Sequence, residues 1–212
     1  MAPSPSFLNE LSERLKEAGV FRYGIASVEG GVDAGSVSQY EEWIASGRHA
    51  GMNYLEKYAE LRREPQLLLP GAKSLISCAF SYFTPLPPSP LLWARYALGD
   101  DYHDVIRRRL SKVAEWLSLN LVCEYRICVD TAPLRERYWA QKSGLGFIGL
   151  NNQLIIPGCG SRFLLGEILV GAELPSDKAC SMSCGECRQC IENCPGRALD
   201  GTGGMDARKC LS

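Results

Sequence analysis

The sequence SLISCAFSYF, from Ser74 to Phe83, is a continuous apolar stretch that follows the turn residues Pro70 and Gly71. A stretch of this kind, bounded by residues that break regular structure, is typical of a β-strand that is buried on both faces. We therefore predict that residues 74–83 form the central strand of the protein.

Helices and strands are predicted to alternate around this central strand. Ser6 can cap a helix whose apolar residues recur at helical spacing from Leu8 to Ala18, and Gly19 is its expected stop. Similar patterns predict further helices at residues 37–46, 52–61, 104–119 and 134–142. They predict further strands at residues 21–28, 121–129, 153–156 and 163–170, the last two joined through Gly158 and Gly160. These elements together indicate an α+β fold with a mixed α/β domain.

The composition is that of an ordinary globular protein. Hydrophobic residues make up 46% and charged residues 22% of the 212 positions, which argues against a disordered or fibrous chain. The net charge of -1 gives no global attraction to nucleic acid or to an anionic membrane. The first residues lack the basic and apolar parts of a secretory signal, and no apolar stretch approaches the roughly 20 residues of a membrane helix. We therefore expect a cytoplasmic protein without a membrane partner.

Two domains of unequal size are predicted. Residues 1–174 carry the regular apolar patterns, and the four prolines between Pro85 and Pro90 mark a surface loop within this domain. From Pro175 onward, glycine, cysteine and polar residues dominate and the apolar periodicity disappears. We predict that residues 175–212 form a small module that a cofactor holds together in place of a core of its own.

Four cysteines in this module have the spacing C-x2-C-x2-C-x3-C, and Pro195 follows the last of them. They are Cys184, Cys187, Cys190 and Cys194. Thiolates at this spacing are typical ligands of a 4Fe-4S cluster. The alternative is a zinc site, but zinc motifs usually pair two C-x2-C units that are a dozen or more residues apart. The spacing therefore favours iron-sulfur chemistry and electron transfer.

The fourth cysteine of such a run commonly serves a second cluster, so the ligand set is predicted to reach beyond the run. Cys210 is a plausible companion for Cys194, yet the sequence stops at Ser212 with too few thiolates for two clusters. Cys180 is an alternative fourth ligand of the first cluster, in a strained loop. Three other cysteines lie in apolar strand patterns and are expected to be inert core residues: Cys78, Cys123 and Cys128.

The stretch GLGFIG, residues 144–149, spells the G-x-G-x-x-G pattern of dinucleotide-binding folds. Its context argues against that interpretation, because a helix precedes it, and Asn151, Asn152 and a short strand follow it. Two alternatives stay open. The glycines allow the backbone to approach a flat cofactor closely, or they form a tight turn between a helix and a strand.

Asp130 and His103 are the candidate acid-base residues. Asp130 follows a predicted strand, where catalytic groups commonly lie, although it can also cap the helix predicted from Leu134. His103 is one of two histidines and stands at the start of a predicted helix, as an acid, a base or a ligand.

Several motifs together resemble one known family, the epoxyqueuosine reductases, which are cobalamin-dependent iron-sulfur enzymes of queuosine synthesis in tRNA. The motifs extend over almost the whole chain. They are WIASGRHAGMNYL at residues 43–55, residues 62–74 with their Pro-Gly-Ala turn, RYALGDDYH at 95–103, VDTAP at 129–133, residues 144–152, residues 163–168, the cysteine run, and DARKC at 206–210.

The resemblance implies reduction of epoxyqueuosine to queuosine in tRNA by a monomeric enzyme that receives electrons from an external donor. A cobalamin would lie between the α/β domain and a ferredoxin-like module with one or two 4Fe-4S clusters. Asp130 would be the proton donor to the departing oxygen. The residues implied around the corrin or the substrate are Tyr96, Tyr102, His103, Gly144, Gly146, Gly149 and Asn151, and the implied cluster ligands are Cys184, Cys187, Cys190, Cys194 and Cys210.

The sequence departs from the family pattern in two places. Leu150 stands where many relatives have a lysine, and the second cysteine segment of the family is missing after Cys210. The second departure suggests a C-terminally truncated chain. Two alternatives to the enzyme therefore stay open, an iron-sulfur electron carrier without catalysis and an inactive truncated relative.

Overall fold

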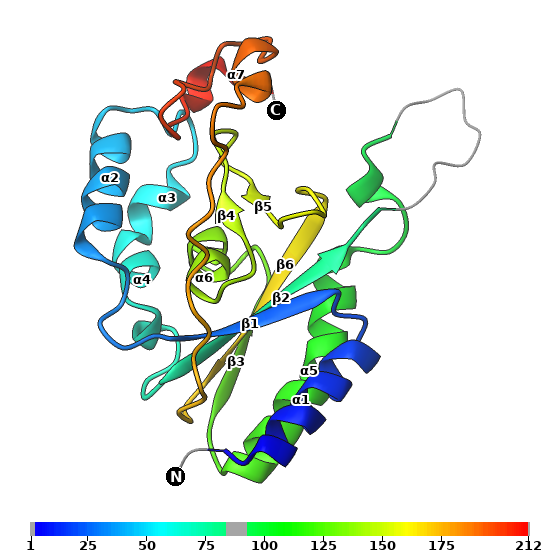
Figure 1. The fold of residues 1–212 in the computed structure, drawn as a ribbon. Coiled ribbons are helices and arrows are strands. Elements are labelled where there is room, and N and C mark those ends of the chain that lie inside the picture. The colour runs from blue at the N-terminus through cyan, green and yellow to red at the C-terminus, as the bar shows by residue number, and fades with distance from the viewer. Residues whose placement is uncertain (1–2, 84–92, 212) are drawn as a thin grey trace.

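A four-stranded antiparallel sheet forms the centre of the computed structural model, which describes residues 3–83 and 93–211 (Figure 1). The strands lie in the order β1-β2-β6-β3, with bounds β1 Arg22–Ser27, β2 Ser74–Ser81, β3 Tyr125–Cys128 and β6 Phe163–Val170. The predicted loop from Pro85 to Pro90 lies outside the described residues. The mixed α/β class predicted from the sequence is confirmed.

Strand β2 is the central strand that its apolar sequence predicts. Seven of its eight residues are buried, and only Ser81 at its end is exposed. Ile76 pairs with Ile25 of β1 on one side and with Ile168 of β6 on the other. Because side chains alternate along a strand, β2 contributes to a hydrophobic core on each face of the sheet.

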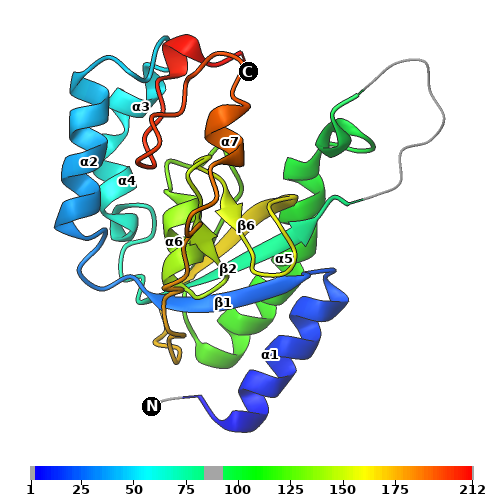
Figure 2. The same ribbon diagram turned by 45° about the horizontal axis from the view of Figure 1, so that its top comes forward.

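Two long helices cover one face, α1 (Pro5–Glu17) and α5 (Tyr102–Leu121) (Figure 2). Leu11 and Leu15 of α1 are fully buried against this face. Burial of a leucine side chain contributes roughly 1.5–3 kcal/mol, so the amphipathic pattern of α1 is enough to fix it there. The helices also touch each other through the stacked rings of Phe7 and Trp116, whose centroids are 4.7 Å apart.

The opposite face carries α6 (Glu136–Lys142) and the hairpin of β4 (Phe147–Ile148) and β5 (Leu154–Ile155). Three further helices lie on this side: α2 Ala34–Ala45, α3 Tyr54–Lys57 and α4 Ala59–Arg63. Trp139 of α6 is almost completely buried and packs with Leu75 of β2 and Leu169 of β6. This packing fixes α6 over the centre of the sheet.

Two predictions about helix ends and continuity are wrong. Ser4, not Ser6, caps α1, since its Oγ accepts the backbone N–H of Phe7 and Pro5 suits the first helical position. The single helix predicted at 52–61 is two short helices, α3 and α4, separated by Tyr58 with a non-helical ψ of 26°. Neither piece has a buried residue, so no core contact holds them as one helix.

Three element boundaries also differ from the prediction. Helix α5 continues to Leu121 and ends at Val122 in the left-handed conformation, which delays β3 to Tyr125. Helix α6 starts at Glu136 because a turn, in which the N–H of Leu134 donates to the Ala132 carbonyl, comes first. Strand β5 is only two residues long.

The C-terminal segment, residues 175–211, contains only the short helix α7 (Gln189–Glu192) and the 3-10 turn η3 (Ala207–Lys209) as helical elements. It is tied to the first domain at several points. Asp177 exchanges two hydrogen bonds with Ile25 at the outer edge of β1, and the N–H of Ala207 donates to the Arg48 carbonyl. The domain boundary after residue 174 stays a prediction. Among the helices of residues 3–83 and 93–211, none is long and apolar enough to cross a membrane.

Candidate functional site

Asp130 lies two residues beyond β3, in a loop that presents its carboxylate to solvent. Its backbone is in the left-handed region, with a φ of 52°, which is uncommon for a residue other than glycine. The alternative role as a helix cap is wrong, because the residue at the cap position of α6 is Arg135 and no side chain caps that helix. Instead, the N–H of Asp130 donates to Oε1 of Glu136 at 2.5 Å.

Asp101, His103 and Asp130 form a chain of interacting side chains between the start of α5 and the loop after β3. His103 Nδ1 lies 2.7 Å from Asp101 Oδ1, and His103 Nε2 lies 3.3 Å from Asp130 Oδ2. Burial disfavours the charged ring, but the two carboxylates outweigh it and raise the pKa of His103. A protonated imidazole donates from both nitrogens, so His103 can hold a proton beside Asp130.

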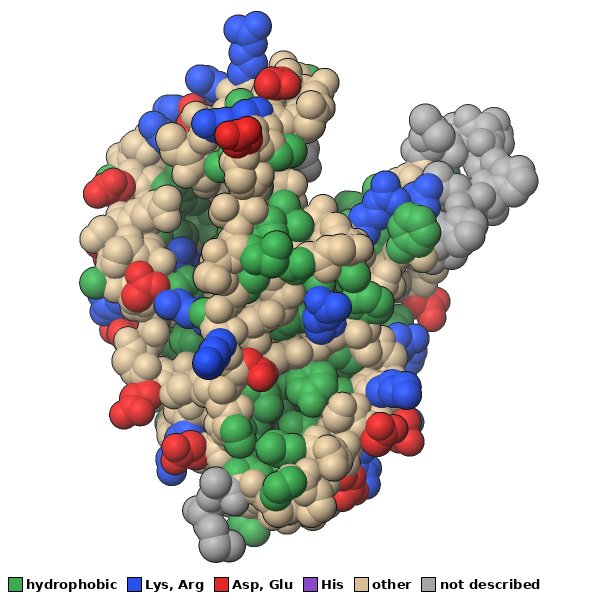
Figure 3. All heavy atoms as spheres, in the orientation of Figure 1, with side chains coloured by type: hydrophobic (Ala, Val, Ile, Leu, Met, Phe, Trp, Pro, Cys, Tyr) green, Lys and Arg blue, Asp and Glu red, His purple; other side chains and the backbone are tan. Residues whose placement is uncertain are grey.

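Tyr102 and Tyr96 join Asp130 around one cavity of about 500 Å³. Burial and the Asp130 carboxylate, to which the hydroxyl is hydrogen-bonded, raise the pKa of Tyr102 to about 12. The hydroxyl therefore keeps its proton at neutral pH. Figure 3 shows the surface hollowed to the right of the C-terminal segment, which lies at the top of the view. Three of the predicted site residues thus share a cavity, and His103 is linked to it through Asp130.

The titration of His103 tests this geometry directly. We expect the pKa of His103, measured by NMR, to fall in Asp101→Asn, because the substitution removes one of the two carboxylates that raise it. The helix should stay intact, since asparagine can still cap α5. The pKa should not move in Asp100→Asn. Since the folded-state pKa is raised, His103 stabilises the fold below the ordinary histidine pKa, and this contribution disappears as the pH rises through the folded value. An unchanged pKa in Asp101→Asn would contradict the arrangement.

The glycine-rich loop between α6 and β5 is partly explained by internal packing. A Cβ on Gly144 would lie 2.6 Å from the Lys178 carbonyl oxygen, and one on Gly146 would lie 2.2 Å from the Ile155 carbonyl oxygen. These glycines are required by close backbone contacts, as a tight turn demands. Gly149 borders a second cavity, of about 480 Å³. The Oδ1 of Asn151 accepts the N–H of Gln153. Cofactor binding by this loop stays a prediction.

The loop also contacts the cysteine run. The N–H of Leu150 points to Cys184 Sγ at 3.4 Å, and Cys180 of the same segment borders the second cavity. The sequence gives no signal for this contact, which depends on how the two segments pack. It places the first cysteine of the run next to the predicted cofactor loop.

The chemistry of the cysteine run suits an iron-sulfur cluster, although the side chains are not gathered into one. Within the part of the chain that the structure describes, no three His, Cys, Asp or Glu side chains are grouped as for a metal ion. Cys194 Sγ accepts the N–H of Ala198 at 3.3 Å. Backbone donors, first that of Ala198, lower the pKa of Cys194 and favour the thiolate that a ligand must be. The donor set therefore fits the cluster.

The cysteines predicted to be inert are those whose surroundings disfavour the thiolate. Cys78 and Cys128 are completely buried, and burial raises the pKa of both thiols, that of Cys128 to about 12. Cys123 is partly buried and its pKa is raised for the same reason. The prediction is confirmed for the first two, and Cys123 is only partly in the core.

Residues 62–131 match the family described as Epoxyqueuosine reductase QueG, DUF1730. Over 207 residues the sequence is 37% identical to the epoxyqueuosine reductase of Synechococcus sp. (strain RCC307), covering 95% of this chain and 64% of that protein. Over almost its whole length the chain is similar to the epoxyqueuosine reductases. It spans less than two thirds of the length of this relative.

Solved epoxyqueuosine reductase structures share the fold. A crystal structure with an epoxyqueuosine-modified tRNA-Tyr stem loop superposes with a TM-score of 0.89 at 28% identity, covering 98% of this chain and 56% of that one. The Bacillus subtilis enzyme, described with its aspartate catalytic loop swung out of the active site, gives 0.88 at 27% identity with the same coverage.

Two carboxylates near the site of this chain were not predicted from its sequence. Glu136 starts α6 and holds the Asp130 N–H, and Glu167 is buried in the middle of β6. A signal for Glu167 was present, because it is the one charged residue in the apolar strand FLLGEILV. Glu136 gave no such signal.

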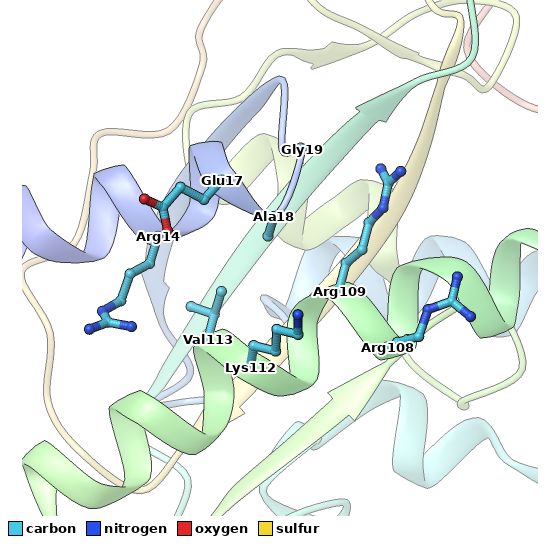
Figure 4. A pocket seen from close by; sticks show the side chains of 8 residues that line it. All are labelled: Arg14, Glu17, Ala18, Gly19, Arg108, Arg109, Lys112 and Val113. Carbon is cyan, nitrogen blue, oxygen red and sulfur yellow. The ribbon is translucent and has the colours of Figure 1, made fainter.

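A basic cavity of about 410 Å³ lies apart from this site, between α1 and α5 (Figure 4). Its cationic side chains come from both helices, and they are Arg14, Arg108, Arg109 and Lys112. Glu17 also lines the cavity, and Arg14 is paired with Glu10. The cavity is thus a local basic surface on a chain with almost no net charge.

Proposed function

We propose that this chain takes part in the reduction of epoxyqueuosine to queuosine in tRNA. The observation that carries the proposal is that Asp130 and Tyr102 meet at one cavity, with His103 joined to them through its contact with Asp130. Removal of an epoxide oxygen as water consumes two electrons and two protons, so the site needs both an electron source and a proton donor. The family relatives named for this reaction support the same function.

The proton side of the reaction is assigned to Asp130. Its carboxyl group donates a proton to the departing oxygen, and His103 at 3.3 Å restores that proton. Tyr102 keeps the carboxyl oriented through its hydrogen bond. General acid catalysis of this kind is worth about 10²- to 10⁴-fold in rate. The loop position of Asp130 agrees with the aspartate catalytic loop of the Bacillus subtilis enzyme.

The supply of electrons is assigned to iron-sulfur clusters and a cobalamin, which the fold would hold next to each other. Cys184, Cys187 and Cys190 would bind one 4Fe-4S cluster, and Cys194 with Cys210 would serve a second. A cobalamin between the α/β domain and the ferredoxin-like segment would supply the reducing electrons to the epoxide. Gly149 and Leu150 line the same cavity as Cys180, and the N–H of Leu150 points to Cys184 Sγ. This position suits a cobalamin that contacts both the α/β domain and the cysteine run.

The tRNA would meet the protein on basic surfaces around the site. A relative has been crystallised with an epoxyqueuosine-modified tRNA stem loop, which supports tRNA as the substrate here. Arg137 lines the cavity of Asp130 and holds the loop carbonyl of Asn152. The cytoplasm, where tRNA is modified, is the proposed location, and an external donor would supply the electrons. The monomeric state stays a prediction.

The proposal is tested with anaerobically purified protein, reconstituted with iron, sulfide and cobalamin and given a strong reductant. Epoxyqueuosine tRNA is added, and the nucleosides released by digestion are identified by mass. Conversion to queuosine is the expected result. A protein that binds cluster and shuttles electrons but leaves the epoxide intact would be an electron carrier, and a colourless protein without cluster would be an inactive relative.

A further inference from the structure

Glu167 is a carboxylic acid in a place where a charge is costly. It lies in the middle of β6, is completely buried, and faces the side of the sheet covered by α6, as its neighbours Leu165 and Leu169 do. Ser77 Oγ, on the neighbouring strand, donates to its Oε1 at 3.3 Å. Its Oε2 has no hydrogen-bond partner among the described residues. A buried polar atom without a partner usually costs about 1–3 kcal/mol, so its retention calls for a reason.

The neighbour of Glu167 is a second carboxyl group, that of Glu136. Two neighbouring carboxylates do not both stay ionised at such a place, whereas one shared proton forms a hydrogen bond between an oxygen of Glu136 and an oxygen of Glu167. The titratable or charged groups that face the pair come from every element around it: Cys78 of β2, Cys128 of β3, Tyr102 of α5, Arg137 of α6, and Asp130. Arg137 is the one cation in this set, and it faces Glu136 and not Glu167.

Glu136 connects the buried pair to the loop of Asp130. Its Oε1 accepts the backbone N–H of Asp130 at 2.5 Å. Asp130 is in the left-handed region, and a non-glycine residue stays there only when its surroundings hold it. A hydrogen bond from an N–H to a carboxylate is stronger than one to a neutral acceptor. The acceptor on Glu136 therefore helps to hold the Asp130 backbone in this conformation, while Tyr102 and His103 contact its side chain.

We propose that Glu136 and Glu167 form a proton-sharing carboxyl pair that anchors the Asp130 loop in its active position. Glu136 lines the same cavity as Asp130, whereas Glu167 is buried behind it, and both are assigned as positioning residues because they act through Asp130. This inference rests on the proposed function of Asp130. It adds a reason for an acidic group at Glu167, where an apolar residue would give a more stable core.

The pair makes a prediction about stability that needs no activity. Burial first, and then the Asp130 carboxylate, raise the pKa of Glu136 to about 7, although the Asp130 N–H and the hydrogen bond with Glu167 lower it. Burial and the Glu136 carboxylate raise the pKa of Glu167 well above its ordinary value. Above the ordinary glutamate pKa the unfolded chain releases protons that the folded chain keeps, so stability falls as the pH rises. In Glu167→Gln the amide can donate to an ionised Glu136, and the ionisable group that is completely buried is removed. We expect this variant to lose most of the decline in its unfolding midpoint between about pH 5 and pH 8.

The matched control is Glu124→Gln, an exposed glutamate just before β3. Its unfolding midpoint should follow the wild-type pH dependence. If Glu167→Gln also declines as the wild type does, the shared proton is refuted. This measurement is independent of the proposed reaction, because the unfolding midpoint reports on the protonation of Glu136 and Glu167 even in a protein without reductase activity.

The anchor is tested with Glu136→Ala, which removes the acceptor of the Asp130 N–H, and Glu136→Gln, which keeps an acceptor oxygen. We expect faster hydrogen exchange at the Asp130 amide in Glu136→Ala, and protection close to wild type in Glu136→Gln. In the reconstituted enzyme Glu136→Ala should lower kcat by up to about 10²-fold, the scale of a 1 Å misplacement, with little change in KM. Glu136→Gln and Glu167→Gln should shift the pH at which kcat changes. Wild-type exchange at the Asp130 amide in Glu136→Ala, or an unchanged pH profile of kcat in both glutamine variants, would overturn the proposal.

Discussion

Asp130→Asn is expected to lower the turnover of epoxyqueuosine tRNA by about 10²- to 10⁴-fold, the range that a positioned general acid supplies. Asparagine has almost the same shape as aspartate, and its backbone N–H can still donate to Glu136, so the loop should keep its conformation. What the variant lacks is the proton for the departing oxygen. Single-turnover conversion, followed by the mass of the released nucleoside, measures the loss.

Binding of the tRNA separates this loss from misfolding. We expect Asp130→Asn to bind the tRNA about as well as the wild type, since the lost interaction belongs to the transition state. Asp104→Asn is the matched control, because this aspartate follows His103 on α5 but forms its ion pair, among the described residues, with Arg107 and not with the site. It should keep wild-type turnover. An Asp130→Asn variant with near wild-type turnover would rule out the assignment.

The parts of the fold that the sequence predicts best are those decided by local burial. Strand β2 follows directly from its apolar stretch, and α5 from a single apolar face that runs from Ile106 to Leu117. The segment at 52–61 has helical composition but no buried residue, and it breaks at Tyr58. Its shape is set by neighbouring segments, and a periodic pattern carries no information about them.

The features of the candidate site likewise differ in whether a local sequence signal predicts them. The spacing of the cysteines and the position of Asp130 after a strand are local signals, and both could be read directly. The contact between Glu136 and Glu167 depends on the placement of α6 over β6, two elements more than 20 residues apart in the chain. Sequence reasoning can note a glutamate in an apolar strand, but it cannot supply the neighbour that explains it.

Cys187→Ser is expected to abolish the iron-sulfur cluster, the largest single effect that this chain offers. Iron and acid-labile sulfide per chain should fall to a small fraction of the wild-type values, and the broad visible absorbance should disappear. The reason is that a serine oxygen is a hard and weakly acidic ligand, whereas the cluster needs soft thiolates. Cys187 is the best test position because it is exposed and because, among the described residues, its sulfur accepts no hydrogen bond of the kind that Cys184 and Cys194 accept.

Cys159→Ser provides the control for this experiment. Cys159 is also exposed, but it lies in the turn between β5 and β6, outside the run, so its replacement should leave the iron content unchanged. The choice of metal is tested in the same samples. If wild-type protein reconstituted with both metals holds zinc in place of iron, or if Cys187→Ser keeps its iron, the run does not bind an iron-sulfur cluster. Loss of iron in Cys187→Ser alone would show that this run holds the iron-sulfur cluster.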